Sequence, residues 1–422
     1  MIVSLSLAQL KRWGIKSGVS ILDQGSYSLG NFISIILLAR WQEPDEYGAF
    51  SVAFATYLFF AGLYNGMALE PISILAPSRY RDRRGEYLSS QFGLHLLLSI
   101  PFAALLYLCG WVIGDQGSRN AFEAAALALP FMLLIWLARR IYYAEYNPVG
   151  ALTCSLLYSF VLLSGLLCLR AISTLTVDGI FAVMSLAGLI GGMSVFWRAR
   201  QYHFSSLKSF VPEVVVAHWQ LGKWIVLGAL FLLLAELAPL VFLATLRGLE
   251  EVAAFKAIQN FILPMMQVQA ALSLAGLPVL AREFSARDIK AFQRTGFMLT
   301  AAMTGLAVIY EVFLLFVHRA LAQFIYQGQY TTYIDLIPLY GVVPVLVGLF
   351  SGGFLSLRVI QNSRIYLLSG FIPFALGIPA CYLWTKSYGI AGTISGIIAT
   401  HVFILLVSFY FYYRRLLREE FA

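Results

Sequence analysis

Long apolar runs alternate with short polar segments along the whole chain. About twelve runs are each long enough to cross the ~30 Å hydrocarbon core of a bilayer as a helix. Their approximate bounds are 18–39, 48–77, 88–113, 121–143, 149–169, 176–197, 224–246, 252–280, 292–317, 332–357, 365–384 and 388–412. Strands of a membrane β-barrel would be about ten residues long and strictly alternating, a pattern this sequence lacks. The pattern predicts an all-α polytopic membrane protein with about twelve transmembrane helices.

Two polar corners between apolar runs repeat the same pattern. Segment 241–255 matches segment 36–50 at an offset of 205 residues, through the identical pairs Leu38/Leu243, Ala39/Ala244, Glu46/Glu251, Ala49/Ala254 and Phe50/Phe255. A second echo joins Gly179-Ile180 to Gly389-Ile390, at an offset of 210 residues. An internal repeat sets the architecture. We therefore expect two pseudo-symmetric six-helix lobes, 1–205 and 206–422, which share one orientation because six is even.

Composition and charge agree with a membrane protein. The chain is 60% hydrophobic and 12% charged, with a mean hydropathy of +0.79, whereas soluble domains carry about 25% charged residues. With the N-terminus placed in the cytoplasm, 22 of the 29 Lys and Arg residues fall in inner loops and tails and six in outer loops. Cytoplasmic loops are enriched in Lys and Arg. The bias predicts that both termini lie in the cytoplasm.

Several classes of function are disfavoured by what the sequence lacks. The net charge of +8 is spread over alternate loops, which does not indicate a nucleic-acid partner. Neither G-x-x-x-x-G-K-[ST] nor G-x-G-x-x-G occurs, so we expect no nucleotide hydrolysis by this chain. The four cysteines lie inside apolar runs without paired spacing. We expect no cofactor, no metal and no enzymatic activity.

Ionisable residues inside apolar runs are the candidate functional residues, because each costs roughly 2.5–3.5 kcal/mol on insertion scales. Glu236 is the deepest acid and precedes Pro239, which suits proton or cation coupling; the alternative is a structural hydrogen bond between helices. Asp23, with Gln24, lies in the first run at inner-leaflet depth. Asp23 is a candidate to bind a cation or cap an inner gate, or else to snorkel towards basic residues at the interface.

Two further positions interrupt or edge the apolar runs. Glu70 precedes Pro71 in the second run, and broken helices expose backbone at substrate depth in transporters. The alternative is a kink whose acid pairs within the bundle. Lys256 lies one turn into the eighth run. It is a candidate to snorkel outward, to pair with Glu250 or Glu251, or to hold an anion.

Arginines cluster at two inner ends of the predicted spans. They are Arg79, Arg81, Arg83, Arg84, Arg139 and Arg140. Such clusters are typical of topogenic charge and of contact with anionic lipids. Because Arg forks match phosphate oxygens, capture of a pyrophosphate head group is the alternative function.

Several of these segments resemble one known family. Asp23-Gln24-Gly25, the corner 43–48 and the segment 69–80 resemble bacterial polysaccharide exporters, and Gly389-Ile390-Ala391-Gly392 resembles their Gly-Ile-x-Gly motif. These are the O-antigen and exopolysaccharide flippases of the multidrug/oligosaccharidyl-lipid/polysaccharide (MOP) superfamily. The resemblance implies a V-shaped transporter of two lobes. It also implies a polyprenyl-pyrophosphate-linked oligosaccharide as cargo, moved from the cytoplasmic to the periplasmic leaflet by alternating access.

Three functions follow as hypotheses. The first is a lipid-linked oligosaccharide flippase for surface polysaccharide, with membrane lipids, a polysaccharide polymerase and chain-length proteins as candidate partners. Asp23, Gln24, Glu70, Glu236 and Lys256 would then form the substrate or ion pathway. The second is a cation-coupled multidrug or toxin extruder of the same superfamily. The third, a membrane polysaccharide polymerase or ligase, is disfavoured because no outer loop is large enough to carry a catalytic constellation.

Overall fold

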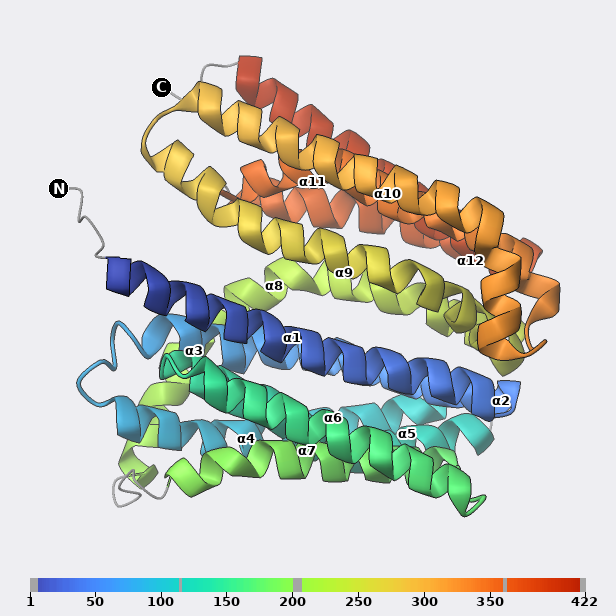
Figure 1. Ribbon diagram of the computed structural model, residues 1–422, viewed down its shortest axis with the longest axis horizontal. Helices are drawn as coiled ribbons and strands as arrows, with labels where there is room; N and C mark the ends of the chain where they lie inside the picture. The colour runs from blue at the N-terminus through green and yellow to red at the C-terminus, as the bar shows by residue number, and fades with distance from the viewer. Residues whose placement is uncertain (1–6, 114–115, 200–206, 360–362, 418–422) are drawn as a thin grey trace. The chain divides into compact units, whose positions relative to one another are not determined.

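The computed structural model describes residues 7–113, 116–199, 207–359 and 363–417. Within these ranges every regular element is helical (Figure 1). The elements are α1 (Leu7–Trp41), α2 (Pro44–Tyr64), the π-helix η1 (Asn65–Leu69), α3 (Glu70–Leu75), α4 (Arg84–Ile113), α5 (Gln116–Ala144), α6 (Pro148–Ala171), α7 (Val177–Ala199), α8 (Leu207–Arg247), α9 (Leu249–Ser285), α10 (Ile289–Tyr326), the 3-10 helix η3 (Thr331–Leu336), α11 (Ile337–Val359) and α12 (Ser363–Leu417). The predicted all-α fold is confirmed.

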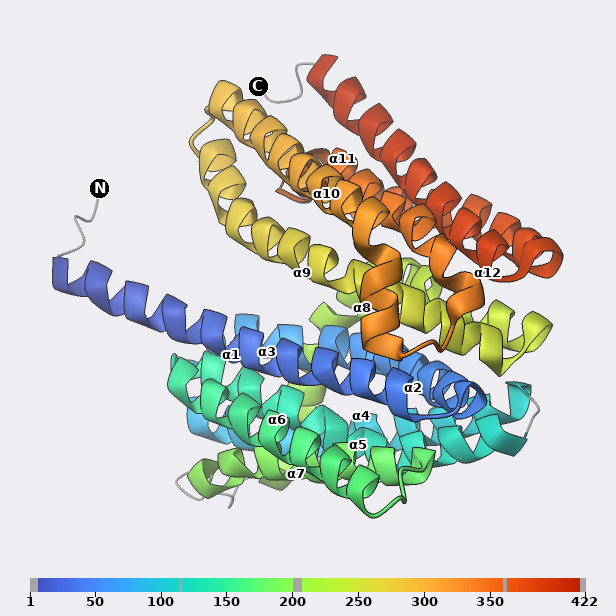
Figure 2. The same ribbon diagram turned by 45° about the vertical axis from the view of Figure 1, so that its right-hand side comes forward.

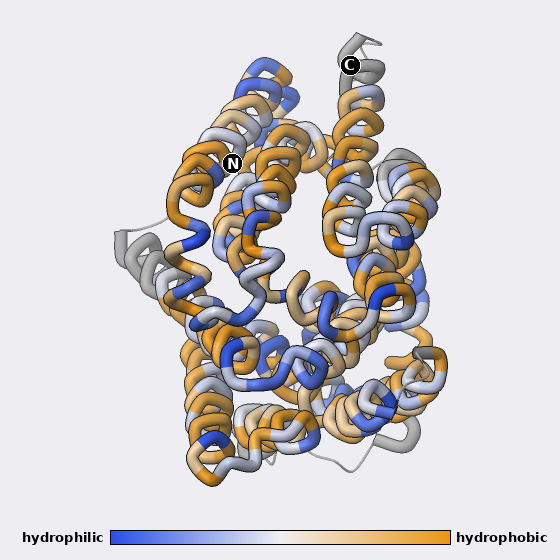
Figure 3. The backbone as a smooth tube through the Cα atoms, turned by 90° about the vertical axis from the view of Figure 1, so that its right-hand side faces the viewer, coloured by the Kyte–Doolittle hydropathy of each residue, from blue (hydrophilic) through white to orange (hydrophobic). Residues whose placement is uncertain are grey.

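The twelve predicted runs correspond to helices in order. Ten helices within the described ranges are long and apolar enough to cross a membrane, and hydrophobic residues colour most of their length (Figure 3). The polar helix α1 is not among these ten. The last two predicted runs are a single element, α12, broken at Gly389. Hydropathy thus locates the last two spans, and the conformation of Gly389 determines how one follows the other.

Gly389 has φ +54° and ψ −132°, a conformation that favours glycine. The N–H of the next residue, Ile390, donates to Glu251 Oε2 at 3.1 Å. Glu251 also pairs with Arg247, at 3.3 Å. The acid of the second repeated corner therefore caps the helix that restarts after Gly389, where a carboxylate stabilises the free N–H groups.

The chain divides into two compact units. Unit 1 contains residues 1–42 and 53–226, and unit 2 contains residues 43–52 and 227–422. The boundary lies inside α8, and a short segment at the start of α2 belongs to unit 2. The repeated halves expected from sequence were 1–205 and 206–422. The compact units differ from them at the start of α2 and at the boundary within α8.

Unit 1 is built around α5, which packs against α4 and α7, while α1 packs along α6 (Figures 1 and 2). Small residues permit this close packing. A Cβ at Gly188 of α7 would lie 2.4 Å from the Phe131 carbonyl oxygen of α5. A Cβ at Gly30 of α1 would lie within 3 Å of Ser159 of α6. These contacts set which faces of α1, α5 and α6 meet.

Unit 2 repeats the scheme, with α11 packed against α9, α10 and α12. The helices α10 and α11 meet closely at Gly296, Gly348 and Gly352. A Cβ at Gly352 would lie 2.0 Å from the Gly296 carbonyl oxygen. The pairs α4–α5 and α10–α11 occupy equivalent places in the repeat, so both units use the same contact between their third and fourth spans.

Candidate functional site

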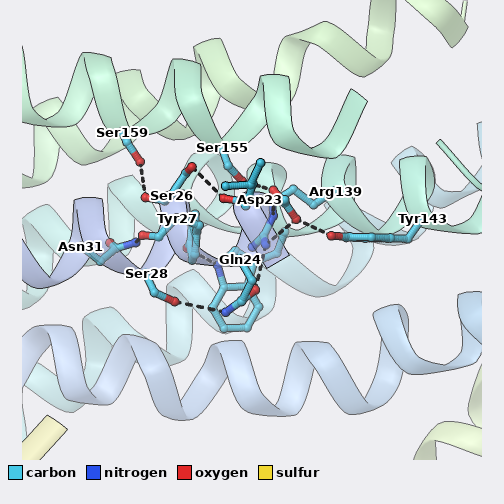
Figure 4. Close-up of polar contacts among 12 residues, drawn as sticks. Asp23, Gln24, Ser26, Tyr27, Ser28, Asn31, Arg139, Tyr143, Ser155 and Ser159 are labelled. Atoms are coloured by element: carbon cyan, nitrogen blue, oxygen red, sulfur yellow. Dashed lines mark hydrogen bonds and ion pairs between the residues drawn. The ribbon is translucent and has the colours of Figure 1, made fainter. Parts of the chain in front are cut away.

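A buried ion pair lies in unit 1 (Figure 4). Asp23 of α1 is fully buried, and its Oδ2 lies 2.9 Å from Arg139 Nη2 of α5. Arg139 Nε donates to Oδ1 at 3.2 Å, Tyr143 to Oδ2 at 2.6 Å and Ser155 to Oδ1 at 2.5 Å. Arg139 also donates to the exposed Gln24, at 2.9 Å. Four donors thus satisfy one carboxylate.

This network forms because three helices present polar groups at the same height. On α1, Asp23 and Tyr27 lie one turn apart and share a face. The Arg139 guanidinium stacks over the Tyr27 ring at 4.5 Å, and Trp136 donates to the Tyr27 hydroxyl at 2.7 Å. A charge buried inside the protein, such as that of Asp23, is tolerated only with hydrogen-bonded partners. The alternative that Asp23 snorkels to the interface is wrong, because the carboxylate is buried against α5 and α6.

Sequence reasoning singled out Asp23, Gln24 and Arg139 but did not connect them. It missed Tyr27, Tyr143, Ser155 and the outer members of the network, where Tyr158 donates to Asn31 at 2.9 Å. Spacing offered a signal, because Asp23, Tyr27 and Asn31 recur every four residues, as do Arg139 and Tyr143. The residues of α6 carried no comparable charge to mark them.

A second cluster surrounds the break in the second span. The predicted interruption at Glu70–Pro71 takes the form of the π-helix Asn65–Leu69 between α2 and α3. Asn65 donates to Glu70 Oε1 at 3.2 Å. Arg140 donates to Asn65 Oδ1 at 3.1 Å and to Ser73 at 2.9 Å, and its charge interacts with that of Glu70. Glu70 therefore pairs within the bundle, and Arg140 lies in this cluster.

Glu236 and Lys256 come together in unit 2. Their charges interact electrostatically across α8 and α9. Lys256 donates to Gln259 at 2.7 Å, and Gln259 donates to the Tyr340 hydroxyl of α11 at 3.1 Å. Lys256 does not pair with Glu250 or Glu251. The Glu236 side chain is exposed and has no hydrogen bond within the described part of the chain.

The other predicted arginines lie at the ends of α3 and α4. Arg79 pairs with Glu213 at 3.5 Å, and Arg83 pairs with Glu86 at 2.7 Å. Arg81 is exposed, and the Arg84 guanidinium lies 5.5 Å from the Tyr146 ring centroid. The six arginines thus separate into the exposed Arg79, Arg81 and Arg83 and the partly buried Arg84, Arg139 and Arg140.

No protein-family model matches the sequence, and no curated protein matches it. Solved structures do. The chain is similar to an inward-facing multidrug resistance MATE family transporter of the MOP superfamily, with 13% identity, a TM-score of 0.80 and coverage of 96% of this chain and all of the other. It is also similar to the inward-closed lipid II flippase MurJ, with 15% identity, a TM-score of 0.71 and coverage of 93% and 86%. An outward-facing multidrug resistance MATE family transporter is similar as well, with 13% identity, a TM-score of 0.67 and coverage of 94% of each chain. The chain is a multi-pass membrane protein with the fold of the MATE transporter and of MurJ.

Proposed function

We propose that this protein exports a polyprenyl-pyrophosphate-linked oligosaccharide from the cytoplasmic to the periplasmic leaflet of a bacterial inner membrane. One observation carries the proposal: each acid of the predicted pathway lies near a basic side chain of the same chain. Asp23 is bonded to Arg139, Glu70 interacts with Arg140, and Glu236 interacts with Lys256.

This pairing bears on the charge of the cargo. A transporter that binds a cationic drug through an acid needs a carboxylate that can accept the cargo. The Asp23 carboxylate already accepts four hydrogen bonds and is fully buried. A pyrophosphate would instead compete with Asp23 for Arg139, because planar guanidinium groups bind phosphate oxygens in a bidentate manner. The Arg139 side chain is 13% exposed and lies beside the exposed Gln24, so it is the accessible member of the pair.

The similarity to the lipid II flippase supports a lipid-linked cargo. In this proposal the saccharide and pyrophosphate pass through a polar pathway containing Asp23, Gln24, Glu70, Glu236 and Lys256. The polyprenyl chain remains in the membrane lipid. The arginines between α3 and α4, Arg79, Arg81 and Arg83, with Arg84 at the start of α4, gather the anionic head group at the cytoplasmic side. A polysaccharide polymerase and chain-length proteins are the proposed partners, and the chain itself performs no covalent chemistry.

A cation-coupled multidrug or toxin extruder is the second candidate. The TM-score of 0.80 with the MATE transporter favours it. So does Glu236, an exposed residue that makes no hydrogen bond within the described residues.

The deciding experiment measures surface polysaccharide and lipid-linked intermediates in a deletion strain. The flippase proposal predicts loss of polymer with lipid-linked oligosaccharide accumulating on the inner leaflet. Normal polysaccharide with increased drug sensitivity would establish the extruder. Polymer loss with unpolymerised units on the outer leaflet would indicate a polymerase or ligase.

Complementation then tests the pathway. We expect the triple variant Asp23→Asn, Glu70→Gln and Glu236→Gln to lose export while reaching the membrane at the wild-type level. The matched control is Asp45→Asn with Glu46→Gln, two exposed acids of the first corner. Full export by the triple variant would remove these acids from the pathway.

A further inference from the structure

The π-helix of the second span contains a carbonyl group that a proline leaves without its usual partner. Pro71 has no N–H to donate to the oxygen of Met67, four residues earlier. His218, on the first half of α8, lies with Nδ1 3.1 Å from that oxygen. Because a carbonyl only accepts, Nδ1 is the donor and carries the proton. His218 therefore replaces the hydrogen bond that Pro71 removes.

The second ring nitrogen of His218 is also occupied. With the proton on Nδ1, the Nε2 atom is an acceptor, and the Tyr87 hydroxyl of α4 lies 2.8 Å from it. His218 is 2% exposed. Burial lowers the pKa of His218 to about 4, so the imidazole is neutral at physiological pH. One ring thus joins three elements, η1, α4 and α8, in a single protonation state.

Close backbone packing holds the imidazole in this place. A Cβ at Gly222, one turn beyond His218, would lie 3.0 Å from Met67 Cα. A Cβ at Gly66 would lie 2.9 Å from a methyl group of Val226. No larger side chain fits between α8 and the π-helix at these positions, so α8 lies directly on the broken segment.

The charged and titratable groups near this contact lie in the α3–α4 connection and at the start of α4 and α8. Tyr80 stacks on Tyr87 with ring centroids 4.4 Å apart, and its hydroxyl donates to Glu213 Oε1 at 3.1 Å. Arg79 and Arg83 approach the same carboxylate to 3.5 and 4.0 Å. Glu213 thus fastens the start of α8 to the α3–α4 connection, and His218 fastens the next turns to η1.

We infer that His218 is a positioning residue for the polar cluster of the second span. Met67 lies inside the five-residue π-helix, which begins at Asn65 and is followed directly by Glu70. Asn65 donates to Glu70 and accepts from Arg140, whose charge also interacts with that of Glu70. Without His218 the Met67 carbonyl would have no donor, because Pro71 offers no N–H to close the α-helical hydrogen bond. The segment would then have to shift to bring this oxygen to another donor or to water. Such a shift would move Asn65 relative to Glu70 and weaken the hydrogen bond that Arg140 donates to Asn65. The neutral imidazole acts through the backbone of Met67 and touches neither Arg140 nor Glu70.

A double-mutant cycle between Pro71 and His218 tests this inference. Pro71→Ala restores an N–H for Met67 and makes the His218 bond redundant. His218→Ala removes the bond, and His218→Asn keeps a donor near the position of Nδ1. The primary readout is amide hydrogen exchange of segment 65–76 in purified protein, which reports local opening without any assumption about the cargo. The control is His401→Ala, a change in α12 at a part-buried ring that lies 2.8 Å from a helix carbonyl.

We expect His218→Ala to speed exchange in segment 65–76 about tenfold, the effect of one lost hydrogen bond. His218→Asn should remain within about threefold of wild type, and His218→Ala in the Pro71→Ala background should have little further effect. Unchanged exchange in His218→Ala, or equal acceleration in both backgrounds, would overturn the inference. If His218→Ala does not fold, Tyr87→Phe, which removes the hydroxyl that holds Nε2, is measured with and without Pro71→Ala in its place. Faster exchange in Tyr87→Phe that Pro71→Ala suppresses would support the inference, and unchanged exchange would overturn it.

Export activity is the second readout, and only this part rests on the proposed function. Loss of export in His218→Ala that Pro71→Ala restores would show that the positioned cluster serves transport. Changed exchange with unchanged export would confirm His218 as a positioning residue and count against the pathway assignment of Glu70. The two proposals therefore fail separately.

Discussion

Asp23 shows how a single buried charge is accommodated. Its carboxylate exchanges water for four donors, two of them from one guanidinium. Removing one partner of a buried ion pair leaves the other charge without compensation, which is far more costly than losing an exposed pair. The stability of unit 1 should therefore depend on Arg139 much more than on the surface arginines.

We predict that Arg139→Ala destabilises the protein by about 3–5 kcal/mol, because Asp23 then remains buried without a counter-charge. Thermal unfolding in detergent is the measurement. Asp23→Asn should cost less, since the neutral amide leaves no buried anion. The control is Arg81→Ala, at an exposed arginine, with an expected change within about 0.5 kcal/mol. Similar melting temperatures for Arg139→Ala and Arg81→Ala would contradict the role of the pair.

His218 predicts a pH dependence of stability. The folded protein protonates this ring only near its lowered pKa of about 4, whereas the unfolded chain does so near 6.5. Between these values the unfolded state binds more protons, so stability falls as the pH falls, by up to about 3 kcal/mol. His218→Asn lacks this contribution. Melting curves from pH 7.5 to 4.5 should show a smaller loss for His218→Asn than for wild type; parallel losses would disprove the assignment.

Sequence alone identified the charged members of both unit 1 clusters but not their pairing. Arg139 and Arg140 were grouped with the surface arginines because all six end an apolar run. Their neighbours in sequence do not reveal that one faces α1 and the other faces η1. Consecutive residues of a helix point about 100° apart, so Arg139 and Arg140 face different neighbours once α5 is packed against the other helices. Ser155 and Tyr143 became visible only once α1, α5 and α6 were placed together.

At the level of elements, glycines decide which helices touch. The contact between α5 and α7 exists because Gly188 has no side chain opposite the Phe131 carbonyl. In α10, by contrast, Gly305 has nothing within 4 Å of an added Cβ. The two residues are indistinguishable in a hydropathy pattern, because both lie inside apolar runs. This is why the sequence predicted the helices and not their partners.

We predict opposite effects for the same substitution at these two glycines. Gly188→Ala should lower the melting temperature, because its Cβ would lie 2.4 Å from a backbone oxygen that cannot move independently. Gly305→Ala should be neutral or raise it, since alanine favours a helix over glycine by up to about 1 kcal/mol. Both are measured by thermal unfolding of the purified protein. A destabilised Gly305→Ala would reveal a contact that the structure lacks.

At the scale of the whole molecule, the two compact units differ from the halves expected from sequence at the start of α2 and at the boundary between the halves. The expected boundary fell in the polar loop 198–222, yet the compact unit extends to residue 226. Glu213 and His218 explain the difference, because both bind unit 1 although they belong to the helix that leads into unit 2. Polar residues in this segment suggest a loop from sequence, whereas the structure has the first part of helix α8 there, packed against unit 1.

The arginine and lysine bias also gives a prediction for the whole chain. Single cysteines at the exposed positions Thr174 and Thr331 should react with an impermeant thiol reagent in cells whose outer membrane is permeabilised. Cysteines at the exposed Asp82 and Ser285 should react only after the inner membrane is also opened. The background lacks the four native cysteines. The reverse pattern would place both termini outside the cytoplasm.

The first corner has a consequence for how the protein is made. Gly48 belongs to unit 2, and an added Cβ there would lie 2.1 Å from the carbonyl oxygen of Leu249. Leu249 leaves the ribosome roughly 200 residues after Gly48, which at 5–20 residues per second is a delay of about 10–40 s. Until then the start of α2 lacks the surface against which it packs. Unit 2 can be completed only late in translation. A truncated N-terminal half would contain residues 43–52 without the part of unit 2 against which they pack.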